Sequence, residues 1–153
     1  MKRLTKVLAT LVVGSVVLLS AFAYYGASAN ANVAKELRDN PGGERAELVM
    51  LLTFQNGREL PVNYLREDDQ VFVGADGRWW RAFRDGNVPV TVFIKGQEYA
   101  GRARTVMNDP EYTREVFERL RPNVPKWLPD WLDAHLIVID LEVRVCPPSF
   151  VGF

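Results

Sequence analysis

A succession of short apolar runs separated by tight turns constrains the fold of this chain more than any other feature. Residues 47–54 and 60–66 are strand-length runs, and the Asn56-Gly57 dipeptide between them is typical of a type I′ hairpin turn. A third strand-like run, residues 70–75, follows a second turn. Runs joined by tight turns pair as antiparallel strands, so the sequence predicts a sheet built from hairpins.

The second half of the chain repeats this pattern and adds a helix. Residues 88–95 and 97–106 form a second predicted hairpin, and residues 136–143 form a last strand. Between them, Asp109 as N-cap and Pro110 at the first helical position predict the start of a helix. The predicted fold class is therefore α+β and mainly β: a small antiparallel barrel with one or two flanking helices.

The amino terminus is a separate apolar segment. Three cations lie in the basic end, residues 1–6, and residues 7–25 carry no charged side chain. About twenty apolar residues in a helix match the hydrocarbon thickness of a bilayer, and the preceding cations favour a cytoplasmic position for that end. The sequence thus predicts a single-pass transmembrane helix over residues 7–27, with the folded domain outside the cytoplasm.

A cleaved signal peptide is the alternative interpretation of this segment. Ala27-Ser28-Ala29 fits the small-residue pattern of a cleavage site, which would leave the domain exported. In either case residues 28–45 are predicted as a linker, because a Pro-Gly-Gly cluster begins at Pro41. Residues 46–145 then form the folded domain and residues 146–153 a tail.

The charge and the scarcity of two residue types exclude several function classes. Nineteen Lys and Arg balance 19 Asp and Glu, so bulk electrostatics do not favour a nucleic-acid partner. One cysteine cannot form an intrachain disulfide. With one histidine, His135, and no Cys or His pair, the sequence predicts no metal site. A lone histidine before a buried strand is typical of a structural role.

A tryptophan pair in a basic, turn-rich stretch is the main candidate for a binding site. Trp79 and Trp80 are flanked by three arginines, Arg78, Arg81 and Arg84. Aromatic faces with guanidinium groups favour a flat, anionic ligand, which would stack on the rings and pair its charge. The alternative is that the aromatic side chains cap one end of a β core while the arginines point to water.

The order of these motifs resembles the deazaflavin-dependent nitroreductases and quinone reductases. These are split β-barrels related to the flavin-binding pyridoxamine-phosphate-oxidase group. The matching parts are residues 51–53, Gly57-Arg58, residues 62–66, residues 79–83 in the family's aromatic slot, and residues 90–92. The resemblance covers about residues 46–143 and implies a split barrel with the cofactor ring along its groove.

The resemblance also implies a cofactor, substrates and a set of site residues. The cofactor would be the deazaflavin coenzyme F-420, with FMN as an alternative and loss of the cofactor as a third case. Substrates would be a quinone or a nitroaromatic, and the chain would form a homodimer. The implied cofactor-binding residues are Arg58, Asn63, Tyr64, Trp79, Trp80, Arg81 and Arg84, and Tyr64 is also a weak candidate for donating a catalytic proton.

Two functions are therefore expected. The first is a membrane-anchored oxidoreductase that reduces a quinone or nitroaromatic with a deazaflavin or flavin. The second is a non-catalytic, membrane-anchored split-barrel module that binds a lipophilic or anionic small molecule or a protein partner. Glu59 favours the second function, because it adds a negative charge beside Arg58 where the family holds a phosphate.

Overall fold

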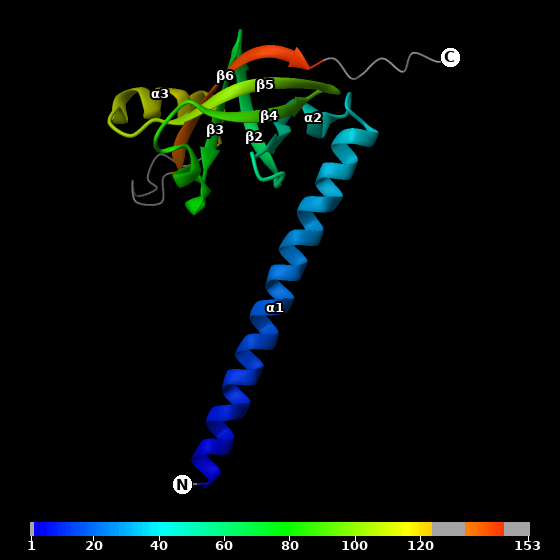
Figure 1. Ribbon diagram of the computed structural model, residues 1–153, viewed down its shortest axis with the longest axis vertical. Coiled ribbons are helices and arrows are strands. Elements are labelled where there is room, and N and C mark those ends of the chain that lie inside the picture. The colour runs from blue at the N-terminus through cyan, green and yellow to red at the C-terminus, as the bar shows by residue number, and fades with distance from the viewer. Residues whose placement is uncertain (1, 124–133, 146–153) are drawn as a thin grey trace.

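A single long helix leads into a small barrel in the computed structural model, which describes residues 2–123 and 134–145. The helix α1, Lys2–Asp39, projects away from the barrel (Figure 1). Its 38 residues span about 57 Å at the usual helical rise. The irregular crossover that the sequence predicts at residues 124–132 and the predicted tail at residues 146–153 lie outside the described residues.

The predicted linker, residues 28–45, is largely helical. Residues 28–39 continue α1 without a break, and α2, Glu44–Leu48, follows the Pro41-Gly42-Gly43 turn. Within the residues that the structure describes, no helix is long and apolar enough to cross a membrane. Membrane anchoring through residues 7–27 therefore stays a prediction.

Six antiparallel strands form a closed barrel in the order β1-β2-β3-β6-β5-β4. The strands are β1, Val49–Thr53; β2, Glu59–Glu67; β3, Gln70–Ala75; β4, Val88–Ile94; β5, Gln97–Thr105; and β6, His135–Val145. The barrel predicted from the hairpin pattern is confirmed. The pairing that closes it is β3 with β6, which are about sixty residues apart in the chain.

Two further helical segments cover parts of the barrel. The 3-10 helix η1, Arg78–Phe83, connects β3 to β4, and α3, Pro110–Leu120, follows β5. The Asp109 side chain accepts a hydrogen bond from the Tyr112 backbone N–H at 3.0 Å, which confirms the predicted N-cap. Gly57 and Gly96 adopt positive φ at the β1–β2 and β4–β5 turns, where a side chain would be strained. Asn56 does not adopt positive φ, so the type I′ turn predicted at Asn56-Gly57 is wrong, although a tight turn does join β1 to β2 there.

Alternating residues of the six strands fill the barrel, because successive strand side chains point to opposite faces. Inward-facing, buried side chains include Met50, Leu52, Val62, Val71, Val73, Val90, Val92, Ile137 and Ile139. Two smaller clusters lie outside the barrel wall. Ala34 and Leu37 of α1 pack with Ala46 and Leu51, and Val116 of α3 packs with Phe72, Leu136 and Val138.

Candidate functional site

The geometry of η1 sends its two tryptophans in different directions. A 3-10 helix has three residues per turn, so consecutive side chains lie about 120° apart around its axis. The buried Phe83 fixes one end of η1 in the barrel core. The other contact is a hydrogen bond of 2.9 Å from the Thr105 hydroxyl of β5 to the Trp80 carbonyl oxygen. Trp79 and Trp80 therefore do not form one continuous wall.

Trp79 belongs to an aromatic cluster at one end of the barrel. Its ring centroid lies 6.0 Å from that of Phe54 and 6.2 Å from that of Phe83, both edge-to-face, and Phe54 stacks on Phe83 at 5.4 Å. These spacings are in the range in which aromatic pairs stabilise a core. The contacts of Trp79 therefore agree with the alternative prediction, in which the aromatic side chains cap one end of the β core.

Trp80 lies instead in a basic cluster with a histidine. His135, the first residue of β6, stacks on the Trp80 indole with ring centroids 3.9 Å apart and planes 7° from parallel. The Arg84 and Arg81 guanidinium carbons lie 5.0 Å and 5.7 Å from the centroid of the same ring. We call these four residues the η1 cluster. His135 covers one face of the indole and the two guanidinium groups lie over the ring, so a ligand that stacks on Trp80 has to displace one of these side chains.

The arginines around η1 differ from most others in the described part of the chain. Arg38, Arg45, Arg102, Arg104, Arg119 and Arg121 each form an ion pair with a carboxylate. Among residues 2–123 and 134–145, no carboxylate lies within ion-pair distance of Arg78, Arg81 or Arg84. Positive charge without a partner collects on this segment, as an anion-binding surface requires.

The surroundings of His135 keep its imidazole neutral. Burial lowers the pKa of His135 below its ordinary value of 6.5, and the positive charges of Arg81 and Arg84 lower it further. A neutral imidazole can donate a hydrogen bond from one ring nitrogen and accept one at the other. The η1 cluster thus combines two fixed cations with a neutral group that can hold or pass a proton.

A split in the barrel wall lies on the other side of Trp79. β2 pairs with β3 only from Tyr64 to Glu67, so the first half of β2 pairs with β1 alone and the last two residues of β3 pair with β6 alone. A pocket of about 230 Å³ opens between these edges. Its polar lining includes Asn63, Asp76 and Arg121, and Trp79 forms one side. We call it the split pocket.

Arg121 closes one end of the split pocket. Its guanidinium donates to both carboxylate oxygens of Asp76, at 2.8 Å and 3.0 Å, and lies over the Phe117 ring. Gly74 leaves room for it, because a Cβ at this position would lie 2.6 Å from the guanidinium. The charge of Arg121 is therefore compensated, and its contribution to the split pocket is shape and hydrogen bonding.

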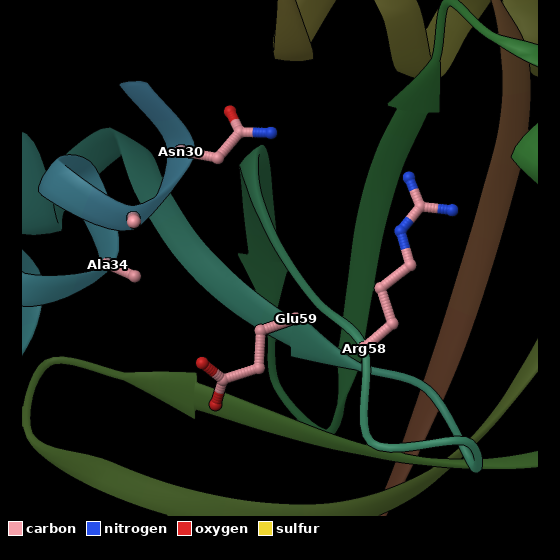
Figure 2. A pocket seen from close by; sticks show the side chains of 5 residues that line it. Asn30, Ala34, Arg58 and Glu59 are labelled. Atoms are coloured by element: carbon pink, nitrogen blue, oxygen red, sulfur yellow. The ribbon is translucent and has the colours of Figure 1, made fainter. Parts of the chain in front are cut away.

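Arg58 lines a different pocket, between α1 and the β1–β2 turn. This pocket of about 460 Å³ is lined by Asn30, Ala31, Ala34, Arg58 and Glu59 (Figure 2). The Glu59 carboxylate forms an ion pair with Arg38 of α1. Glu59 was expected to disfavour an anion beside Arg58. Its negative charge is instead compensated by Arg38, a partner that the sequence did not indicate.

Tyr64 faces the barrel interior. Its hydroxyl donates a hydrogen bond of 3.1 Å to the Ala46 carbonyl oxygen, and the residue is 9% exposed. Burial raises the pKa of the Tyr64 phenol above its usual value, which makes proton release harder. In this position Tyr64 holds α2 against the barrel and lines neither of the two pockets.

The seven predicted cofactor residues therefore divide among four places. Trp80, Arg81 and Arg84 come together in the η1 cluster, Asn63 and Trp79 line the split pocket, Arg58 faces α1, and Tyr64 is inside the barrel. Asn63 and Tyr64 separate because neighbours on a strand point to opposite faces. Sequence reasoning assigned His135 to a structural role and missed Asp76 and Arg121. The described residues contain no group of His, Cys, Asp and Glu suited to a metal ion.

Comparison with known proteins supports the fold. No family model and no curated protein matches the chain. A candidate pyridoxamine 5′-phosphate oxidase from Listeria innocua is similar in structure, with a TM-score of 0.53 and 16% identity over 66% of this chain and 90% of that chain. A candidate general stress protein 26 from Jannaschia sp. CCS1 has a TM-score of 0.44 and 18% identity over 73% of this chain and 75% of that chain.

The similarity to the Listeria protein confirms the barrel fold that the family resemblance implied. The barrel of this chain is similar in fold to that protein. At 16% identity the comparison concerns the fold alone. The deazaflavin-dependent family, the nitroreductase and quinone reductase activities and the homodimer remain predictions.

Proposed function

We propose that this chain is a membrane-anchored oxidoreductase that uses a flavin or deazaflavin to reduce a quinone or a nitroaromatic. The observation that carries the proposal is the η1 cluster, two uncompensated arginines against a tryptophan on a barrel of the pyridoxamine-phosphate-oxidase type. The fold favours FMN as the first cofactor to test, with the deazaflavin coenzyme second. Residues 7–27 would hold the domain at the outer side of the membrane.

The described residues fit the two demands that a flavin-type cofactor makes of a protein. Its phosphate tail needs cations without a carboxylate partner, and among the described residues Arg81 and Arg84 have none, although both lie over the Trp80 ring. Its planar ring needs an aromatic surface, and Trp79 provides one where it lines the split pocket beside Phe54. When bound, the cofactor supplies the hydride or electron chemistry.

The remaining residues of the proposed site would orient the ligand and handle a proton. Asn63 presents an amide at the split pocket, where it can hydrogen-bond a ring edge or an acceptor. His135, whose pKa is lowered by burial and by the two arginines, can in its neutral form donate one hydrogen bond and accept another. Phe54, Trp79 and Phe83 exclude water from this end of the barrel.

Cofactor titration of the full chain in detergent tests this proposal. We expect FMN or the deazaflavin coenzyme to bind and to quench tryptophan fluorescence, and Arg81→Gln with Arg84→Gln to weaken binding at least tenfold, because both phosphate contacts are lost. The matched control is Arg102→Gln with Arg104→Gln, which removes the same charge from arginines that have carboxylate partners. Equal affinities for the two double variants would place the cofactor elsewhere.

A second candidate function has its own supporting observation. The predicted cofactor residues do not converge on one pocket, and the split pocket is smaller than most cofactor sites. This arrangement favours a non-catalytic module that binds an anionic or lipophilic molecule or a protein partner. Absence of binding by both cofactors, in a chain with a cooperative thermal transition, would make this module the preferred function.

A further inference from the structure

The carboxy-terminal part of α1 is joined to the barrel as one packed unit. Ala34 and Leu37 are 8% and 2% exposed and pack against Ala46 and Leu51. The ion pair between Arg38 and Glu59 adds a polar contact between α1 and β2. Any pocket between α1 and the barrel therefore has walls that are held in place.

The pocket lined by Asn30, Ala31, Ala34, Arg58 and Glu59 lies at this junction, and we call it the helix–turn pocket. Figure 2 shows the Arg58 guanidinium and the Asn30 amide extending from opposite walls, while the Glu59 carboxylate points away from both. Because Glu59 pairs with Arg38, and because no described carboxylate lies within ion-pair distance of Arg58, the pocket has one uncompensated positive charge.

Arg58 is positioned by its own turn. Its backbone N–H donates to the Asn56 side-chain oxygen at 3.0 Å, and its carbonyl accepts from the Phe54 N–H at 2.9 Å. Its guanidinium carbon lies 5.6 Å from the centroid of the Phe54 ring, a cation–π distance. An arginine restrained in this way loses less conformational entropy when it binds an oxyanion.

The pocket begins on α1 at the outer edge of the headgroup layer of a bilayer. If residues 7–25 occupy the hydrocarbon core, Asn30 is five residues beyond Tyr25, which is about 7.5 Å along the helix. The headgroup region extends about 5 to 7 Å beyond the hydrocarbon on each side. At physiological ionic strength a charge at this height is within about one Debye length of the membrane surface.

From these observations we infer that the helix–turn pocket binds the phosphate of an anionic phospholipid headgroup through Arg58, with the Asn30 amide as a second donor. This inference rests on the membrane anchoring in the proposed function. It adds a lipid partner and a binding site separate from the η1 cluster. An anionic lipid bound there fixes the barrel against the membrane surface.

Hydrogen exchange of the full chain in lipid nanodiscs tests the inference. Discs of phosphatidylcholine alone are compared with discs that also contain phosphatidylglycerol, which carries a net negative charge. We expect the amides of residues 54–60 to exchange several-fold more slowly in the anionic discs. Arg58→Gln should abolish that difference, whereas Arg114→Gln, an equal charge loss at an exposed position on α3, should preserve it.

The possible results distinguish failure of the lipid-site inference from failure of the membrane-anchoring prediction. A chain that alkaline carbonate strips from membranes overturns both the anchoring and the lipid site. An inserted chain whose turn exchanges equally in both kinds of disc overturns the lipid site alone. Equal protection by inorganic phosphate in phosphatidylcholine discs identifies a free-anion site and overturns the assignment to lipid. A thermal transition like that of the unsubstituted chain shows that Arg58→Gln is folded.

Discussion

At the scale of single residues, the surroundings of His135 change how readily its imidazole binds a proton. Burial and the nearby Arg81 and Arg84 hold its pKa below 6.5 in the folded chain. The unfolded chain therefore binds this proton more readily than the folded one does. The contribution of His135 to stability is fully present above about pH 6.5 and is lost as the pH falls through the folded pKa.

Nuclear magnetic resonance can follow this titration, because the chain has one histidine and hence one imidazole signal set. We expect a midpoint below 6.5 for the unsubstituted chain, and a higher midpoint in Arg84→Gln, which removes one of the two repelling charges. Arg114→Gln, with its side chain on α3, should leave the midpoint unchanged. A midpoint at or above 6.5 in the unsubstituted chain would contradict the stacked, half-buried position of the ring.

The stack of His135 on Trp80 was not predictable from the sequence. The two residues are 55 positions apart, and they meet because Ala75, just before η1, pairs with His135 in the β3–β6 register. That register depends on barrel closure, which local patterns do not specify. The position of the turn at Asn56-Gly57 and the Asp109 cap were predictable, since each depends on residues within four positions, whereas the predicted type I′ geometry of that turn is wrong.

At the scale of elements, the β5–β6 pair comes into close contact at Gly101. The β5–β6 register shifts between Ala100 and Gly101, as in a β-bulge. A Cβ on Gly101 would lie 2.9 Å from the Asp140 backbone oxygen and 3.0 Å from the Ile139 side chain. Backbone atoms of a paired strand cannot move aside without breaking ladder hydrogen bonds, so this position accepts only glycine.

Gly101→Ala should therefore lower the free energy of unfolding by about 1 to 3 kcal/mol, the usual cost of overpacking. Gly42→Ala is the matched control, because a Cβ there meets nothing within 4 Å. We expect it to change stability by less than about 0.5 kcal/mol. Chemical denaturation followed by circular dichroism measures both. Similar midpoints for the two variants would mean that β5 and β6 can move apart at the bulge without lowering the free energy of unfolding.

At the scale of the whole molecule, α1 is part of the folded unit rather than a tether. The sequence predicted a linker over residues 28–45 because breakers cluster at Pro41, but Ala34 and Leu37 are buried before that point. Helix periodicity alone could not show this, because the apolar surface that covers them comes from α2 and β1. The docked end of α1 is also what creates the helix–turn pocket.

Leu37→Ala should release the end of α1 from the barrel, since the side chain is 2% exposed. Truncation of a buried leucine costs about 2 to 5 kcal/mol. We expect faster hydrogen exchange over residues 30–39 and a lower midpoint of denaturation. Leu48→Ala makes the same chemical change at a residue that is 67% exposed, and it should alter neither measurement. If the two variants behave alike, the contact between α1 and the barrel is not a stabilising one.

Because α1 continues without a break into the end that packs against the barrel, the helix fixes the rotation of the barrel around its axis. Each residue added or removed between Tyr25 and Asn30 would rotate the barrel by about 100° around the helix axis and shift it by about 1.5 Å along that axis. The number of residues in this interval therefore determines how the barrel is oriented relative to the amino-terminal part of α1. A flexible tether of the same length would not have this property.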